Sequence, residues 1–147
     1  METGVVIALV ALSSTRKNWG LIAAGLAAAL RPELVVYAFV LGVGRASSSR
    51  LLLPALALTT LPALSVAMIR MVYFGEPYPL AAAAKPADLT PGLFYSAQAL
   101  LLAGPFWLWP GPGFRRLDRL ERGHAVAVVA HLVAVALAGG DWMVLLR

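Results

Sequence analysis

Long apolar stretches separated by short polar ones dominate this chain. Six apolar segments stand out, at 4–13, 19–30, 34–44, 51–69, 92–109 and 124–138. None of them alternates polar and apolar residues with a period of two, and alanine and leucine predominate, so the pattern favours helices over strands. Backbone groups inside lipid must be hydrogen-bonded internally, which a helix achieves. We therefore predict an all-α fold, a polytopic membrane helix bundle of about six membrane segments.

The segments differ in length, and this affects how they cross a bilayer. A membrane span needs roughly 20 residues at about 1.5 Å per residue. The fourth and fifth segments meet this length, whereas the second and third reach only about half of it. These two short segments flank the sequence Arg31-Pro32-Glu33, and a proline disfavours helix at the residue before it. We predict two short helices forming a broken hairpin, with a single kinked helix as the alternative.

Composition agrees with a membrane protein. Of the 147 residues, 61% are hydrophobic and 13% are charged, against about 25% charged residues in a soluble domain. The chain has no cysteine, which excludes disulfides and thiolate metal sites. An acid precedes the first apolar segment and bases follow it, which is the reverse of a secretory signal. We expect a single transmembrane domain over residues 1–147.

The basic residues are concentrated on one side of the predicted membrane. If each segment reverses the chain direction, one set of loops carries eight of the twelve Lys and Arg residues but only two of the seven acids. These bases are Arg16, Lys17, Arg45, Arg50, Arg115, Arg116, Arg119 and Arg122. Cytoplasmic loops are enriched in Lys and Arg, so this side is expected to be cytoplasmic. The distribution also favours the hairpin, because a single span over 19–44 would separate Arg16 from Arg45.

The basic stretch 110–123 has a helical pattern of its own. It places Phe114, Leu117 and Leu120 at helical spacing among arginines. This pattern predicts a short amphipathic helix that lies on the anionic inner leaflet of the membrane. Nucleic-acid binding is the other reading of a basic run, and we expect no nucleic-acid partner here.

The opposite side carries polar groups that suit chemistry at a membrane surface. Its carboxylates are Glu2, Glu33, Glu76, Asp88 and Asp141, and its cations are Arg31, Arg70, Lys85 and Arg147. When a sugar moves from a lipid phosphate to an acceptor hydroxyl, a carboxylate can take the acceptor's proton as general base. Cations, or a divalent metal ion held by carboxylates, would stabilise the departing phosphate. The low dielectric constant at the membrane interface strengthens both effects.

The charged residues of this side also have purely structural interpretations. Arg31 and Glu33 would pair with each other at the break between the two short helices. Arg70 and Lys85 would extend their charged ends to the lipid headgroups while their aliphatic stems lie along apolar surface. Under this interpretation none of the four side chains meets a substrate.

Three further residues have alternatives of the same kind. Asp141 follows two glycines and would cap a helix, and Glu76 would be an ordinary turn residue. His131 lies in the middle of the sixth segment, where a histidine commonly bonds a neighbouring helix. A proton relay is the functional alternative for His131.

Four short motifs occur in order along the chain. They are Met1-Glu2-Thr3-Gly4, Arg31-Pro32-Glu33, Tyr73-Phe74-Gly75-Glu76-Pro77-Tyr78-Pro79 with Ala84-Lys85 after it, and Gly139-Gly140-Asp141-Trp142-Met143 followed by Arg147. In this order they resemble motifs of the GT-C-fold glycosyltransferases related to the mycobacterial arabinofuranosyltransferases. All four fall on the predicted outer face. The chain departs from the family at EPYPLAAAAK, where relatives often have LPNTYYAK.

The resemblance implies an enzyme of the bacterial inner membrane, with multiple passes and an extracytoplasmic site. The donor substrate would be a polyprenyl-phosphate sugar, and the acceptor a glycan, lipid or protein of the cell envelope. A divalent cation is the one cofactor to consider. The implied residues are Asp141 and Glu76 for catalysis, Arg31, Lys85, Arg70 and Arg147 for the donor phosphate, and Glu2, Glu33, Tyr78 and Trp142 elsewhere in the cavity.

Members of that family contain more than these motifs. They have an earlier helix pair joined by an acidic loop, and further helices after the last motif. We therefore expect an internal fragment of a larger enzyme, inactive alone. Competing hypotheses are a segment of a transporter or flippase, suggested by the broken hairpin and His131, and a non-catalytic membrane scaffold subunit. Transporters often contain internal repeats, and the sequence shows none.

Overall fold

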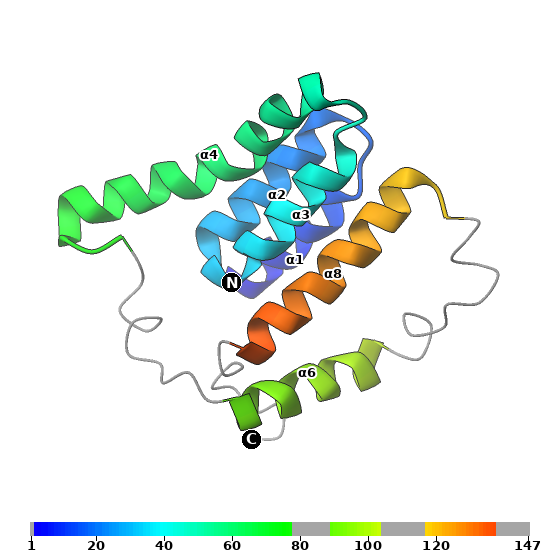
Figure 1. Cartoon of the computed structure of the whole chain (residues 1–147). Coiled ribbons are helices and arrows are strands. Elements are labelled where there is room, and N and C mark those ends of the chain that lie inside the picture. The colour runs from blue at the N-terminus through cyan, green and yellow to red at the C-terminus, as the bar shows by residue number, and fades with distance from the viewer. Residues whose placement is uncertain (1, 78–88, 104–116, 138–147) are drawn as a thin grey trace.

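Helices make up nearly all of the structure. The computed structural model describes residues 2–77, 89–103 and 117–137 (Figure 1). Its elements are α1 (Glu2–Ser13), α2 (Asn18–Leu30), the 3-10 turn η1 (Pro32–Leu34), α3 (Val35–Arg45), α4 (Ser49–Phe74), α6 (Leu89–Ala103) and α8 (Arg119–Leu137). These three ranges contain no strand, which confirms the all-α prediction.

Two helices are long and apolar enough to cross a membrane. α4 has 26 residues and α8 has 19, which correspond to about 39 Å and 29 Å along the helix axis. Only 11% and 22% of their most apolar stretches are buried inside the protein. The described α6 is shorter, at 15 residues. By length and composition, two helices of the described residues could therefore cross a membrane, and the prediction of about six membrane segments is not confirmed among them.

Residues 18–45 form an antiparallel hairpin, as the sequence predicts. α2 ends before Arg31, which is extended, and Pro32 opens η1. Proline fits this first position because no N–H donor is needed there. At the other end of the hairpin, the Arg45 guanidinium donates to the Lys17 carbonyl at 3.3 Å. One continuous helix would place these two residues about 42 Å apart, so the single kinked helix is wrong.

Small residues let the helices of the bundle pack closely. α2 lies against α1, α3 and α4, and α3 lies against α8 (Figure 1). The core consists of Leu21, Ala24, Ala28, Tyr37, Ala38, Leu41, Ala55 and Ala127. A Cβ atom added to Gly25 of α2 would lie 2.6 Å from the Thr59 carbonyl oxygen of α4. Such close backbone approach holds helices together in lipid, where the hydrophobic effect between them is absent.

Tyr37 of α3 contacts two other helices. The Ser13 hydroxyl of α1 donates to the Val10 carbonyl at 2.6 Å and lies 2.6 Å from the Tyr37 hydroxyl of α3. A carbonyl only accepts, so the Tyr37 hydroxyl is the donor to Ser13. The Tyr37 ring also meets the His124 ring of α8 edge-on, with 6.3 Å between centroids. Through these two contacts, Tyr37 connects α3 with α1 and with α8.

α8 begins earlier than the sequence predicts. Residues 119–123 form its first turns and continue without a break to Leu137. The Asp118 Oδ1 atom accepts a hydrogen bond from the Glu121 N–H at 2.9 Å, and Glu121 Oε2 accepts one from the Asp118 N–H at 2.8 Å. This reciprocal pair is a capping box, which satisfies two backbone donors at a helix start. The prediction of a separate surface helix is therefore wrong for residues 117–123.

Candidate functional site

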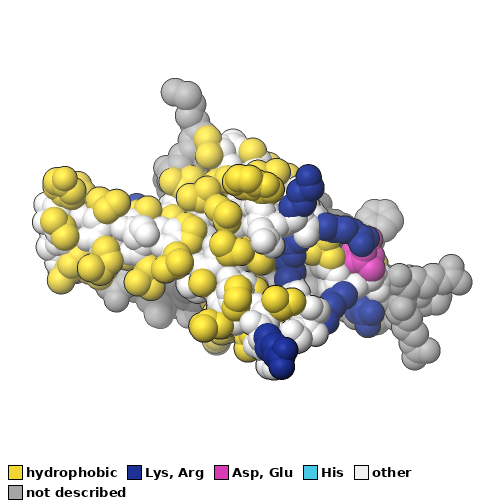
Figure 2. All heavy atoms as spheres, turned by 90° about the horizontal axis from the view of Figure 1, so that it is seen from above, with side chains coloured by type: hydrophobic (Ala, Val, Ile, Leu, Met, Phe, Trp, Pro, Cys, Tyr) yellow, Lys and Arg dark blue, Asp and Glu magenta, His cyan; other side chains and the backbone are white. Residues whose placement is uncertain are grey.

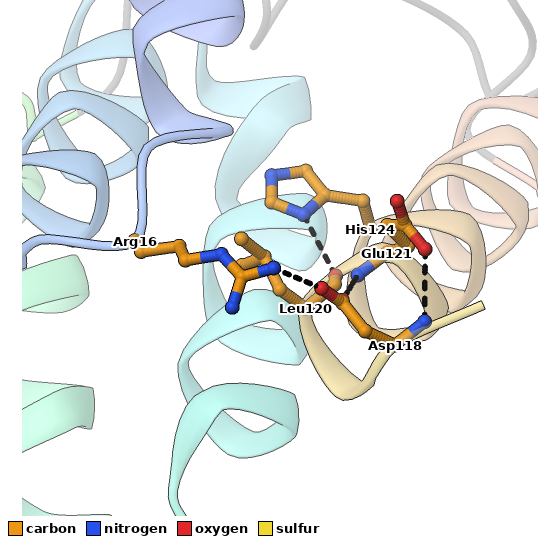
Figure 3. Close-up of polar contacts among 5 residues, drawn as sticks. All are labelled: Arg16, Asp118, Leu120, Glu121 and His124. Atoms are coloured by element: carbon orange, nitrogen blue, oxygen red, sulfur yellow. Dashed lines mark hydrogen bonds and ion pairs between the residues drawn. The ribbon is translucent and has the colours of Figure 1, made fainter.

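Basic residues from four helix ends meet at one end of the bundle. Besides the Arg45 contact with Lys17, Arg16 pairs with Asp118 at 2.5 Å (Figure 3). Arg119 donates to the Gly44 carbonyl at 3.1 Å and also to the Ala46 carbonyl. Figure 2 shows Lys and Arg side chains gathered here, apart from the apolar side chains of α4. The tertiary structure thus assembles the side that the charge distribution predicts to be cytoplasmic.

The carboxylate of Asp118 is stabilised in its charged form. The backbone N–H of Glu121 donates to it, and Arg16 lies beside it, so the pKa of the Asp118 carboxyl lies below its ordinary value. A depressed pKa in the folded state stabilises the fold above the ordinary carboxyl pKa of about 3.9. That contribution is lost as the pH falls through the lower folded value.

Asp118→Asn is therefore expected to lower the thermal unfolding midpoint at pH 7. Asparagine still caps a helix, but it has no charge to pair with Arg16. The difference in midpoint between variant and wild type should narrow as the pH falls below the ordinary carboxyl pKa of about 3.9, and it should disappear below the depressed pKa of the folded-state carboxyl. Circular dichroism melts across this pH range measure it. A difference that stays constant with pH would contradict the assignment.

The Arg31-Pro32-Glu33 turn lies at the other end of the short hairpin. The Arg31 Nη1 atom lies 3.1 Å from Glu33 Oε1, and both side chains are partly exposed. The structural interpretation of this pair is confirmed, because the two residues do bond each other. A partly exposed ion pair is worth about 0–1 kcal/mol, so it adds little to stability.

His131 of α8 joins this turn across the bundle. Its Nδ1 atom lies 2.9 Å from the Glu33 carbonyl oxygen, so Nδ1 carries the hydrogen and Nε2 is the other protonation site. A contact with a neighbouring element was the structural interpretation of His131, and it is confirmed. Its position at the candidate site was missed. Helix length could have indicated it: His131 lies about 18 Å beyond Arg119, which is close to the length of α3.

A cavity of about 480 Å³ lies between the hairpin and α4. It is lined by Ala28, Ala29, Pro32, Val35, Ala38, Thr59, Thr60, Ala63, Leu64, Val66, Ala67, Arg70 and Pro77. Among the described residues that line it, most are apolar and Arg70 is the one with a charge. The cavity brings the Arg31 turn and the stretch from Arg70 to Pro77 to the same place, although they are distant in sequence. Two of the four motifs therefore meet.

Of the remaining predicted site residues, two lie among the described residues and the others lie outside them. Glu76 follows the end of α4 and is exposed, and Glu2 is the first residue of α1. Tyr78, Lys85, Asp141, Trp142 and Arg147 lie outside the described residues. Within residues 2–77, 89–103 and 117–137, no group of three or more His, Asp or Glu side chains could hold a metal ion.

The described part of the site suits an amphiphilic ligand with an anionic group. Its apolar lining accepts a hydrocarbon chain, and Arg70 offers a charged partner for phosphate. The partly exposed Arg31–Glu33 pair adds both signs of charge at the adjoining turn. Protein-family models, curated proteins and solved structures were compared with the chain, and none matches it. Any statement of its function therefore rests on these residues and on the four motifs.

Proposed function

We propose that this protein acts on a polyprenyl-phosphate sugar and transfers the sugar to a cell-envelope acceptor at the outer face of the inner membrane. The observation that carries the proposal is the apolar cavity beside α4, which is lined by Arg70 and by Pro32 and Pro77 of two separate motifs. A polyprenyl chain is apolar and its phosphate is anionic, so one ligand would occupy both parts of the cavity.

The location of the cavity supports the same proposal. It adjoins the Arg31 turn, whereas the basic cluster around Arg16, Arg45 and Arg119 occupies the opposite end of the hairpin. Because bases are concentrated on the cytoplasmic side of membrane proteins, the cavity belongs to the outer half. Donor lipids for envelope synthesis present their sugars there in the family that the motifs resemble.

The proposed reaction is an inverting displacement at the sugar. The acceptor hydroxyl oxygen bonds to the anomeric carbon, while the bond from that carbon to the phosphate oxygen breaks. The polyprenyl phosphate leaves with the electron pair, and a carboxylate takes the hydroxyl proton. Glu76 is the candidate base among the described residues, and Asp141 is the candidate outside them. Arg70 would offset the charge on the leaving phosphate.

Arg70→Gln is expected to weaken the binding of a polyprenyl phosphate at least about tenfold, because a hydrogen bond to a charged group contributes about 1.5–3 kcal/mol. The measurement is a titration of the protein in lipid nanodiscs by microscale thermophoresis. Arg50→Gln is the matched control, since Arg50 is exposed at the opposite end of α4. Equal affinity of the wild type for the unphosphorylated polyprenol would contradict the proposal, as would equal effects of the two variants. Release of labelled sugar from the donor then tests the transfer itself.

A transporter or flippase is the second candidate function. The short hairpin and the contact between His131 and the Glu33 carbonyl favour it, because broken helices and intramembrane histidines often line transport paths. Proteoliposomes carrying a fluorescent polyprenyl-phosphate sugar separate the two functions. Movement of the intact lipid between leaflets would support transport, whereas transfer of its sugar to an acceptor would support the enzyme.

A further inference from the structure

A second hollow lies between α3 and α8, at the basic end of the bundle. It measures about 460 Å³ and is lined by Val40, Val43, Gly44, Arg119, Arg122, Gly123 and Val126. The two glycines bring the helix backbones together, since a Cβ atom added to Gly44 would lie 3.2 Å from the Gly123 Cα atom. The valines form the apolar walls, and Val126 is 52% exposed. The hollow is therefore an open groove on the outside of the bundle; we call it the α3–α8 groove.

Two arginines stand at one end of this groove, one helical turn apart on α8. Arg119 is held in place, because it donates to the Gly44 carbonyl at the end of α3. Arg122 is exposed, and among the described residues its side chain has no hydrogen bond or ion pair, only the longer-range attraction of Asp118. The groove thus combines apolar walls with a charged group that is available to an anion.

The surroundings of the groove are strongly positive. Described residues at this end include the bases Arg16, Lys17, Arg45, Arg50, Arg119 and Arg122, and the acids Asp118 and Glu121. Asp118 is already paired with Arg16, and Glu121 accepts the N–H of Asp118 in the capping box. The positive charge that remains is complementary to a membrane surface that carries anionic lipids.

We propose that the α3–α8 groove binds an anionic phospholipid of the inner leaflet. The lipid phosphate pairs with Arg122, with Arg119 beside it, and one acyl chain lies along Val40, Val43 and Val126. Charge complementarity selects the headgroup, and the apolar walls beyond the arginines select a molecule with a hydrocarbon chain. A soluble acidic peptide would leave these walls uncovered. This inference is independent of the proposed transferase function, because the cavity beside α4 is not part of the groove.

The test counts lipids that stay bound to the purified protein. Native mass spectrometry after exchange into mixed micelles compares phosphatidylglycerol with phosphatidylcholine of the same acyl chains. The wild type should retain phosphatidylglycerol preferentially. Arg122→Gln should weaken that retention about fivefold, the effect of one cation near an anionic surface. Val126→Trp should weaken it as well, because the indole fills the groove while every charge stays in place.

Arg50→Gln is the matched control, because Arg50 belongs to the same basic end but does not line the groove. It should retain the lipid as the wild type does, and circular dichroism confirms that each variant keeps its helices. Equal losses in Arg50→Gln and Arg122→Gln would overturn the proposal in favour of general charge attraction. Equal retention of the two lipids, or equal binding of glycerol phosphate alone, would also overturn it. A dimer mass that Val126→Trp abolishes would assign the groove to a second copy of the chain.

Discussion

Replacing Gly25 by leucine is expected to lower the free energy of unfolding by about 2 kcal/mol. An added Cβ atom at this position would lie 2.6 Å from the Thr59 carbonyl oxygen, 2.9 Å from the Pro62 Cγ atom and 3.0 Å from the Leu58 carbonyl oxygen. Two of these atoms are backbone, so no side-chain rotation relieves the contact and α2 must move away from α4. Overpacking costs about 1–3 kcal/mol, and the better helix propensity of leucine returns less than about 1 kcal/mol. The cost of overpacking therefore exceeds the gain in helix propensity.

Gly4→Leu is the matched control for this prediction. Gly4 also lies in a helix, but nothing lies within 4 Å of an added Cβ atom there. This variant gains helix propensity without a clash, so its unfolding free energy should equal or exceed that of the wild type. Equilibrium unfolding in mixed micelles, followed by circular dichroism, compares the two variants. If both are equally stable, the close α2–α4 packing is not present in the protein.

Leu41→Ala is expected to cost about 2 kcal/mol, the low end of the range for such substitutions in protein cores. Leu41 is fully buried in α3, so its removal leaves a cavity that the surrounding helices only partly fill. The cost lies at the low end because the water-to-oil transfer term is largely absent in lipid, and lost packing contacts make up most of it. Equilibrium unfolding in the same micelles measures this cost.

Leu53→Ala separates packing from a general effect of losing leucine. Leu53 lies on α4 with 77% of its surface exposed, so its side chain has few protein contacts to lose. Its unfolding free energy should stay close to that of the wild type. Similar costs for Leu41→Ala and Leu53→Ala would show that the described core does not form in solution.

Much of the helical structure could be predicted because its signals are local. The predicted segments 19–30 and 34–44 match α2 and α3 to within one residue, since Pro32 interrupts the helix between them. The start of α8 was misplaced, although its signal is equally local. Asp118 and Glu121 have the spacing of a capping box, which predicts a helix start at this point.

In the candidate site, only contacts between residues that are close in the sequence could be predicted. The Arg31–Glu33 pair spans two residues, so its alternative interpretation could be stated from the sequence. The contact between His131 and the Glu33 carbonyl spans 98 residues. Helix length sets how far His131 lies along α8, but that α8 packs beside α3 is decided by contacts between residues far apart in the sequence. The approach of Arg70 to Pro32 around one cavity depends in the same way on how α4 crosses the hairpin.

By itself, the sequence determined the all-α class, the break at Pro32 and the grouping of Arg16 with Arg45 at one end. These follow from backbone hydrogen bonding in an apolar chain and from the positions of charges between apolar segments. Only the tertiary structure decided which helices touch and where cavities remain. The helix faces are rich in alanine and glycine, so hydropathy does not distinguish one partner from another. Close backbone fit chooses among them, and that fit is a sum over contacts between residues far apart in the chain.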